Sequence, residues 1–359
     1  MMSKKAIFSI LLVSAIVFQA YRMATDTGYF VNIQPKSYGT CKKMQGPPGA
    51  EDINVDRINK VAFVSSGNGR EVFEGYRTGR QTKAANGDIW LLDLADKNSV
   101  PRRLNVDIGS SFHPHGIDLL TMENGNRELY VVNHPSYGVH EILIFAIEEN
   151  HDLKLKERVH YPELISPNDI KAIESGKFFA TNDHGSARSS IMYTLEDYLG
   201  LSRTSVTYYD GSTGSFLIKG LKSANGITLS DDQQTLYVAE ALGRKVKRFK
   251  RGESIRDWQF VDSISLTTSV DNLEWGDDGK LLSGAHPKIF DLLAHFENEQ
   301  NQSPSEVVAI DVSSSPMIYE TIYMNDGREM SGSSVATMLD GEMLIGSVLE
   351  RHFLRCSKS

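Results

Sequence analysis

The chain has 359 residues, 40% of them hydrophobic and 23% charged, a balance typical of a globular protein that can bury a sizeable core. Its 46 acidic and 38 basic residues give a formal net charge of −8. This acidity, without a Lys/Arg-rich stripe beyond the N-terminus, argues against a nucleic-acid partner and is compatible with cation binding.

The N-terminus differs from the rest of the chain. Lys4 and Lys5 precede an apolar run of 15 residues at positions 6–20, which is the pattern of a secretory signal. The run is short for a membrane-spanning helix, which needs about 20 residues, but no clean cleavage site follows it. We therefore predict a signal peptide or uncleaved membrane anchor at residues 1–22 and a linker at 23–40. The protein is expected to be exported, to the extracellular space or the periplasm, with membrane or lipid association through the N-terminal segment.

The chain contains only two cysteines, Cys41 and Cys356. Their positions near opposite ends of an exported chain favour one disulfide that closes the chain on itself, although two free thiols are the alternative. In the chain-entropy model a loop of this length contributes about 4–5 kcal/mol of stability.

A strand–turn–strand repeat occurs six times. Each copy has a polar pair, an aliphatic residue, a short alternating stretch, a turn and a second apolar strand. The aliphatic positions are residues 53, 117, 170, 227, 273 and 335, and the second strands are expected at 61–65, 129–133, 177–181, 235–239, 280–284 and 342–346. A third strand is expected in several copies, at 88–94, 141–147 and 245–249, and short helices only at 195–199 and 291–297. Uneven spacing around one theme is typical of propeller blades with variable loops, so we predict an all-β, six-bladed β-propeller over residues 41–359.

Equivalent positions of successive blades surround the central axis of a propeller, so the polar pairs should meet there. The residues two before the aliphatic positions are Glu51, His115, Asn168, Asn225, Asp271 and Ser333; those one before are Asp52, Gly116, Asp169, Gly226, Asn272 and Ser334. Side chains alternate along a strand, so the two sets are expected at different depths or faces. A single Asn or Asp at a strand entrance is usually a turn residue, but oxygen donors in five of six blades favour a metal. An oxygen-rich cage suits calcium, and there is no Cys cluster or HExxH motif for zinc.

Several short motifs, in collinear order between Cys41 and Cys356, resemble those of the paraoxonase family (serum paraoxonase/arylesterase and its relatives). These motifs are Gly49-Ala50-Glu51-Asp52, Pro114-His115-Gly116-Ile117, Val131-Val132-Asn133-His134-Pro135, Pro167-Asn168-Asp169-Ile170, Thr181-Asn182-Asp183-His184, Ala224-Asn225-Gly226-Ile227, Val270-Asp271-Asn272 and His286-Pro287. The resemblance implies a six-bladed propeller with a terminal disulfide and two calcium ions in a central tunnel.

Carried over position by position, the resemblance also implies two ligand sets. The catalytic calcium would be held by Glu51, Asn168, Asn225, Asp271 and Asn272. The deeper, structural calcium would be held by Asp52, Asp169 and the backbone carbonyl of Ile117. Asn272 is the exception to the alternation, because it belongs to the second set of positions and is assigned to the first site.

The family's histidine dyad corresponds to His115 and His134. The resemblance implies that His115 acts as general base on water while His134 tunes it, and that calcium stabilises the oxyanion. Asp183, His184 and His286 are expected to line the pocket or to support the metal ligands. No GxSxG motif is present, so there is no signal of a serine nucleophile.

The predicted function is calcium-dependent hydrolysis of small-molecule lactones, acyl-homoserine lactones among them, and of aryl esters, with organophosphates as a side activity. Two alternatives are a sugar-lactone hydrolase of the gluconolactonase type and a non-catalytic, calcium-stabilised propeller that binds proteins or lipids. Departures from animal members at Ser223, Ala285 and a charged loop over residues 67–85 alter the expected pocket, so the preferred substrate does not follow from the resemblance.

Overall fold

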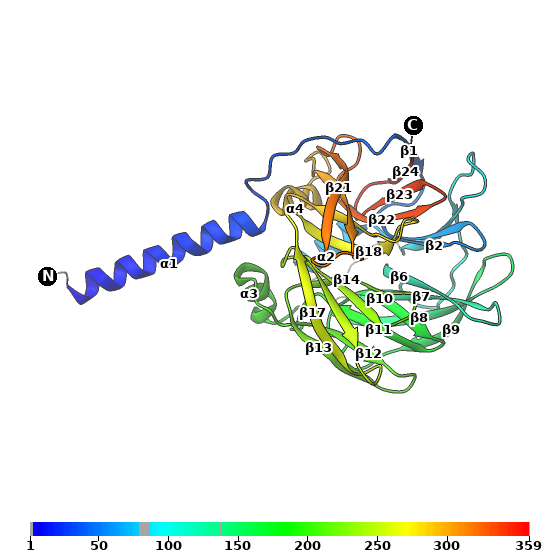
Figure 1. The fold of residues 1–359 in the computed structure, drawn as a ribbon, viewed down its shortest axis with the longest axis horizontal. Coiled ribbons are helices and arrows are strands. Elements are labelled where there is room, and N and C mark those ends of the chain that lie inside the picture. Colours follow the sequence, from blue (N-terminus) through cyan, green and yellow to red (C-terminus); the bar gives the residue numbers. More distant parts are fainter. Residues whose placement is uncertain (1–2, 79–85, 137, 359) are drawn as a thin grey trace.

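The structure, a computed structural model, describes residues 3–78, 86–136 and 138–358. In these residues 24 strands form six four-stranded antiparallel sheets, and four helices lie outside them (Figure 1). The innermost strand of each sheet contacts the innermost strands of both neighbouring sheets, so the sheets close into a ring. The prediction of a six-bladed β-propeller is confirmed.

Blades one to three run from the innermost strand outward as follows. Blade one has β2 (Ala50–Asp56), β3 (Val61–Ser66), β4 (Asp88–Asp93) and β5 (Arg102–Arg103). Blade two has β6 (Pro114–Thr121), β7 (Arg127–Ser136), β8 (Val139–Ile147) and β9 (Leu153–Val159). Blade three has β10 (Pro167–Glu174), β11 (Lys177–Asn182), β12 (Thr204–Tyr209) and β13 (Gly214–Leu221).

The other three blades complete the ring. Blade four has β14 (Ala224–Leu229), β15 (Thr235–Glu240), β16 (Lys245–Arg251) and β17 (Trp258–Ser265). Blade five has β18 (Ser269–Trp275), β19 (Leu281–His286), β20 (Ser305–Asp311) and β21 (Ile318–Asn325). Blade six has β22 (Ser333–Leu339), β23 (Glu342–Ser347), β24 (His352–Ser357) and, from the start of the propeller, β1 (Thr40–Gln45).

Blade six closes the ring because its outer strand comes from the other end of the chain. Strand β1 pairs antiparallel with β24, and Cys41 lies opposite Cys356 in that register. The two cysteines form a disulfide, with their Cα atoms 4.0 Å apart. The predicted disulfide is therefore confirmed.

The core is divided among the contacts between blades. Six clusters of buried side chains each join two adjacent sheets, such as the one that packs Phe63 and Ile89 of blade one against Ile117 and Leu129 of blade two. Each sheet thus buries both faces, as the apolar strands of the repeat require, and the axis is left to the polar residues at the ends of the inner strands.

The helices are α1 (Lys4–Asp26), α2 (Gly69–Thr78), α3 (Ile191–Leu199) and α4 (Ile289–Glu297). The last two contain the predicted helices at 195–199 and 291–297. Helix α2 was not expected, because residues 67–85 read as a charged loop; residues 79–85 of that segment lie outside the described part of the chain.

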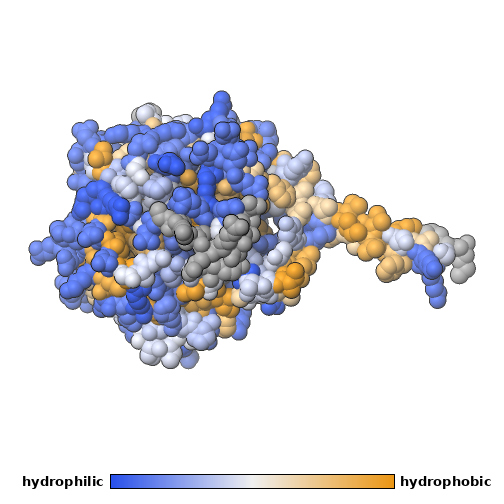
Figure 2. Space-filling model, turned by 180° about the vertical axis from the view of Figure 1, so that it is seen from behind, coloured by the Kyte–Doolittle hydropathy of each residue, from blue (hydrophilic) through white to orange (hydrophobic). Residues whose placement is uncertain are grey.

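Helix α1 projects from the body with its apolar side chains exposed (Figures 1 and 2). Its 23 residues correspond to about 35 Å, longer than the apolar run suggested, and it is the one described helix that is long and apolar enough to cross a membrane. A signal sequence meets the same criterion. At its C-terminal end Gln19 donates to the carbonyl of Tyr198 in α3, and Asp26 forms an ion pair with Lys222. Residue Lys36, in the predicted linker, pairs with Met324 of blade five.

Candidate functional site

A β-bulge interrupts the inner strand of every blade where its polar pair lies. In blade two, for example, two residues lie between Pro114 and Ile117 while only one lies between their partners Asn133 and Val131. The same extra residue is present in the other five blades. A bulge turns two successive side chains away from strict alternation. Both members of a polar pair can therefore face the axis, which a strict alternation of side chains would not allow.

The register corrects the repeat in blade six. Ala336 pairs with Ile345 in the way that Ile117 pairs with Val131, so Ala336 occupies the aliphatic position rather than Val335. Ser334 then takes the place equivalent to Glu51, and its hydroxyl donates to the carbonyl of Glu51 at 2.6 Å. Blade six contributes a serine hydroxyl that supports Glu51.

The five residues predicted to hold the catalytic calcium meet at one end of the axis. Glu51, Asn168, Asn225 and Asp271 line one cavity, and Asn272 reaches across to donate to Oε1 of Glu51 at 3.0 Å. Asn272 therefore contacts this set although it occupies the second position of its polar pair. The β-bulge explains this, because it turns successive side chains away from strict alternation.

The oxygen atoms of this set fit a hard cation. Four of them are buried without a hydrogen-bond partner among the described residues: Oε2 of Glu51 and the Oδ1 atoms of Asn168, Asn225 and Asn272. A buried oxygen without a partner costs about 1–3 kcal/mol, and a cation that these four oxygens coordinated would remove that cost. No group of three or more His, Cys, Asp or Glu that could hold a metal occurs in the described part of the chain, and a cage rich in amide oxygens suits calcium rather than zinc.

The charges of the site also favour a cation. Burial and the neighbouring Asp271 carboxylate raise the pKa of Glu51 to about 8, although the hydrogen bond from Asn272 opposes this. Asp271 in turn is 2.8 Å from Nε2 of His286. A divalent cation between these oxygens would favour the ionised form of Glu51.

The three residues predicted to hold the structural calcium lie on the inner strands of blades one to three, where Asp52 and Asp169 directly follow Glu51 and Asn168. Asp52 accepts from the backbone N–H of Ile117 in the next blade at 2.7 Å, and Asp169 accepts from Ile227 at 2.8 Å. Burial and neighbouring carboxylates raise the pKa of both Asp52 and Asp169 well above the ordinary value, and the charge of Asp52 acts directly on Asp169. The two carboxylates therefore join adjacent blades and repel each other.

Two glycines leave room for this arrangement. A Cβ on Gly116 would lie 2.5 Å from the carbonyl oxygen of Asn168, and one on Gly226 would lie 2.5 Å from that of Asp271. These contacts are too close for any side chain, so the inner strands of blades two and four can approach blades three and five only at glycine. Aspartates and glycines thus alternate around the first four blades.

A charged network that was not predicted from the sequence links the inner strands of blades one, two, three and five. It is formed by residues one after the aliphatic position. The ammonium of Lys171 lies 2.7 Å from Asp118, and Asn54 donates to Glu274 at 2.9 Å. Burial and the charge of Asp52 raise the pKa of Glu274 to about 8, while Lys171 opposes the rise. The charge of Lys171 offsets part of the negative charge of these buried carboxylates.

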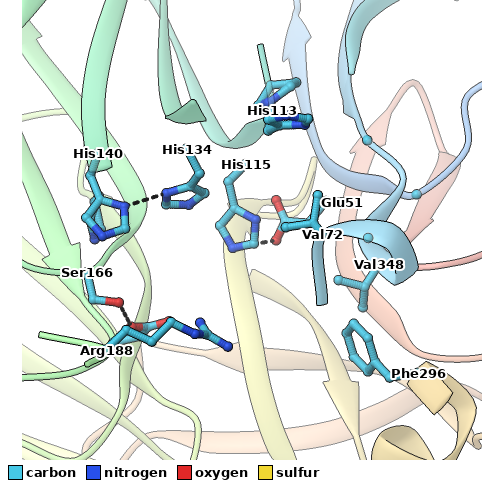
Figure 3. Close-up of a pocket in the computed structure, with 16 residues that line it drawn as sticks. Glu51, Val72, His113, His115, His134, His140, Ser166, Arg188, Phe296 and Val348 are labelled. Atoms are coloured by element: carbon cyan, nitrogen blue, oxygen red, sulfur yellow. Dashed lines mark hydrogen bonds and ion pairs between the residues drawn. The ribbon is translucent and has the colours of Figure 1, made fainter. Parts of the chain in front are cut away.

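His115 adjoins Asn168 and Glu51, two of the residues predicted to hold the catalytic calcium. Its Nε2 lies 3.2 Å from Nδ2 of Asn168. The same nitrogen is 3.6 Å from Oε1 of Glu51 (Figure 3). Burial lowers its pKa, against the opposing effect of Asp271 and Asp183, so the ring is neutral and able to accept a proton at pH 7.

His134 lies beside His115, with ring centroids 5.4 Å apart. A third histidine, His140, was not among the predicted residues, and its Nδ1 lies 2.8 Å from Nδ1 of His134 (Figure 3). A signal was present in the sequence, since His134 directly follows the predicted strand 129–133 and His140 directly precedes the predicted strand 141–147, which places them opposite each other if the two strands form a hairpin.

The buried His184 and the half-buried Asp183 form a charge cluster. His184 lies 2.8 Å from Asp183 and 3.0 Å from Asp197 of α3, and its ring stacks on Tyr193. Burial alone would lower the pKa of His184, but the two carboxylates outweigh it and raise the pKa to about 10. The cluster attaches α3 to blade three, so His184 supports the pocket wall while Asp183 lines the pocket.

This cluster should make stability depend on pH. Because the pKa of His184 is higher in the folded state than its ordinary 6.5, its contribution is complete below about pH 6.5 and is lost as the pH rises through about 10. We expect His184→Gln to lower the free energy of unfolding by about 2–4 kcal/mol at pH 6.5, with a deficit that shrinks toward pH 10. Urea unfolding of both proteins at pH 6.5, 8, 9 and 10 measures this. A deficit of constant size would show that His184 acts through packing alone.

Two adjoining cavities share Glu51, His115 and Asp183. The larger, of about 440 Å³, has an apolar wall contributed mainly by α4, with Met23 and Thr27 of the N-terminal segment and Tyr198 of α3 at its border. The α4 residues are Ile289, Phe290, Leu292, Leu293 and Phe296. The second cavity is lined by His113, His115, His134, His140 and Arg188 (Figure 3).

The chain is similar to a known family over most of its length. A profile of the arylesterase family matches residues 33–357. Serum paraoxonase/arylesterase 2 of Gallus gallus is 32% identical over 328 residues, which cover 89% of each chain. The human protein of that name is 35% identical over 310 residues, or 84% of each chain, and human serum paraoxonase/arylesterase 1 is 32% identical over 334 residues, or 89% of each.

Solved structures share the fold at low sequence identity. A luciferin-regenerating enzyme is 12% identical with a TM-score of 0.51, and covers 89% of this chain and 95% of its own. A calcium-binding regucalcin from Agrobacterium tumefaciens is 11% identical with a TM-score of 0.50, over 90% and 93%. At these identities the likeness concerns the architecture alone.

Proposed function

The chain belongs to the arylesterase family, and from this membership and the geometry of the site we propose that it is a calcium-dependent hydrolase of lactones and aryl esters. The observation that carries the proposal is the set of four unpaired buried oxygens beside His115. We further propose two calcium ions, a catalytic one on Glu51, Asn168, Asn225, Asp271 and Asn272 and a structural one on Asp52, Asp169 and the carbonyl of Ile117.

The residues of the site have distinct roles in this proposal. The bound calcium would polarise the substrate carbonyl and stabilise the negative charge that develops on its oxygen. His115, neutral because of its burial, would accept a proton from the attacking water. His286 holds Asp271 at 2.8 Å, and Asn272 holds Glu51, so both carboxylates are oriented before the substrate arrives.

The walls of the site favour apolar substrates. The α4 side chains Phe290 and Leu293 border the larger cavity, where a sugar lactone would require hydroxyl-binding groups. A lactone or ester with an aliphatic chain would place that chain against α4. A non-catalytic calcium-binding propeller would need only the deeper ligand set, and this chain retains the outer set and His115 as well.

The N-terminal helix is part of the proposal. We infer that α1 is either a signal peptide or an uncleaved anchor and that the protein is exported. The exposed apolar surface of α1 supports this. The C-terminal part of the helix lies beside the larger cavity, where Gln19 donates a hydrogen bond to Tyr198 and Asp26 forms an ion pair with Lys222.

The proposal predicts calcium-dependent turnover. We expect the protein to hydrolyse phenyl acetate and γ- and δ-lactones, to lose this activity in EGTA, and to regain it on addition of Ca²⁺ but not Mg²⁺, because the irregular cage suits only the larger ion. The ratio kcat/KM should rise with the length of the aliphatic substituent on the lactone, with gluconolactone as the polar control. A folded protein that binds calcium but hydrolyses none of these compounds would favour the non-catalytic alternative.

A further inference from the structure

His140 and His134 face each other across the hairpin of blade two. They lie between the paired residues Asn133–Glu141 and Ser136–Val139, where the register of β7 and β8 shifts. Their rings are perpendicular with centroids 5.0 Å apart, and the two Nδ1 atoms are 2.8 Å apart. This contact is the one hydrogen bond found for the His134 ring in the described part of the chain.

The surrounding hydrogen bonds fix this hairpin. Asn133 donates to Glu141 at 2.7 Å and accepts from the backbone N–H of His113 at 2.7 Å. The carbonyl of His140 lies 3.1 Å from Nδ1 of His160. The backbone on both sides of the histidine pair is therefore held in place.

Both rings are neutral. Burial, with the charge of His140 and His115, holds the pKa of His134 well below its usual range, and burial lowers the pKa of His140 to about 4. The other groups whose charge reaches these two rings are Asp183, Arg188 and His113. A hydrogen bond between two neutral imidazoles needs one N–H and one unprotonated nitrogen, so the tautomer of one ring determines that of the other.

We propose that His140 is a positioning residue, which fixes the ring orientation and the tautomer of His134 through the contact between their Nδ1 atoms. With Nδ1 of His134 engaged by His140, only Nε2 of that ring remains to act toward His115, directly or through a water. The relation is similar to that of a carboxylate that orients a catalytic histidine, with an imidazole in its place. The proposal rests on the proposed hydrolase function for its kinetic part, but its structural part can be tested without turnover.

The test compares two substitutions of His140 in the full-length, calcium-loaded protein. His140→Phe removes the contacting nitrogen, whereas His140→Asn places an amide group near the position of Nδ1. We expect H140F to lower kcat for phenyl acetate about tenfold with KM nearly unchanged, and to shift the pH dependence of kcat, while H140N retains most of the activity. Lys154→Asn, at an exposed position of the same blade, is the control and should behave as wild type.

A second measurement reads the tautomer itself. In protein labelled with ¹⁵N-histidine, the ring nitrogens of His134 should report a single tautomer in the wild type and in H140N and a mixture in H140F. Equal losses of kcat in H140F and H140N, or a wild-type pH profile in H140F, would overturn the proposal, and so would an unchanged His134 tautomer. If the wild type hydrolyses no ester, the proposed function fails while the tautomer measurement still decides the role of His140.

Discussion

Replacing Glu51 with Gln should reduce kcat for phenyl acetate and lactones by about 10²–10³-fold while leaving the propeller folded. Oxygen Oε2 of Glu51 is buried without a partner, and Oε1 accepts from Asn272. Glutamine has the same shape and keeps an acceptor for Asn272, but its amide nitrogen would direct two protons to the place of the cation. The loss is therefore chemical rather than steric, and a weaker calcium affinity should accompany it.

The two effects can be measured separately. Activity as a function of free calcium should show a higher half-saturation concentration in Glu51→Gln, and direct calcium titration by calorimetry should show one of two sites weakened. The melting temperature in EGTA should not fall, because the substitution removes a carboxylate that is repelled by Asp271. Glu253→Gln, at an exposed position, serves as the control. A calcium titration identical to that of the wild type would remove Glu51 from the ligand set.

The blade repeat could be predicted because the inner strand, its turn and the second strand are consecutive in the chain. Turn residues and alternating apolar residues mark each copy, so Ile117 and Ile227 could be recognised as equivalent without a structure. The disulfide between Cys41 and Cys356 followed from the same repeat, since the two cysteines flank its first and last copies.

The β-bulges could not be predicted from the alternation of side chains. A bulge depends on the pairing with the neighbouring strand, and that register is not written in the inner strand alone. For this reason Asn272 was an exception to the alternation expected from the sequence. For the same reason Ser333 rather than Ser334 was taken as the equivalent of Glu51 in blade six. The sequence Ser333-Ser334-Val335 resembles the polar pair and aliphatic residue of the other blades. The pairing of β22 with β23, however, shows that Ala336 occupies the aliphatic position.

Contacts between segments that are far apart in the sequence could not be predicted either. The approach of Asp197 to His184 depends on how α3 packs against blade three, and the pairing of Lys171 with Asp118 depends on the closure of the ring. Helix α2 was missed because its polar residues resemble a loop and its apolar positions are few. In each case the tertiary arrangement, rather than local propensity, determines the result.

The last prediction separates a structural calcium site from an ordinary buried hydrogen bond. In calcium, Asp169→Asn should lower the melting temperature by about 5–10 °C, as expected for the loss of about 3–5 kcal/mol when one charge of a buried ionic group is removed. In EGTA the difference should vanish or reverse. There the ionised Asp169 is destabilised by burial and by Asp52, so that the neutral amide relieves a repulsion and loses only the hydrogen bond to the N–H of Ile227.

The melting temperatures of wild type and variant are measured with calcium and with EGTA. The test is whether the difference between the two proteins depends on calcium. Asp231→Asn, at an exposed turn position, should leave all values unchanged. Activity at saturating calcium should fall far less than in Glu51→Gln, because Asp169 lines neither of the two cavities that Glu51 and His115 share. An equal loss of melting temperature with and without calcium would mean that Asp169 stabilises the propeller as a hydrogen-bond acceptor between blades three and four, and that the deeper cation is held elsewhere or not at all.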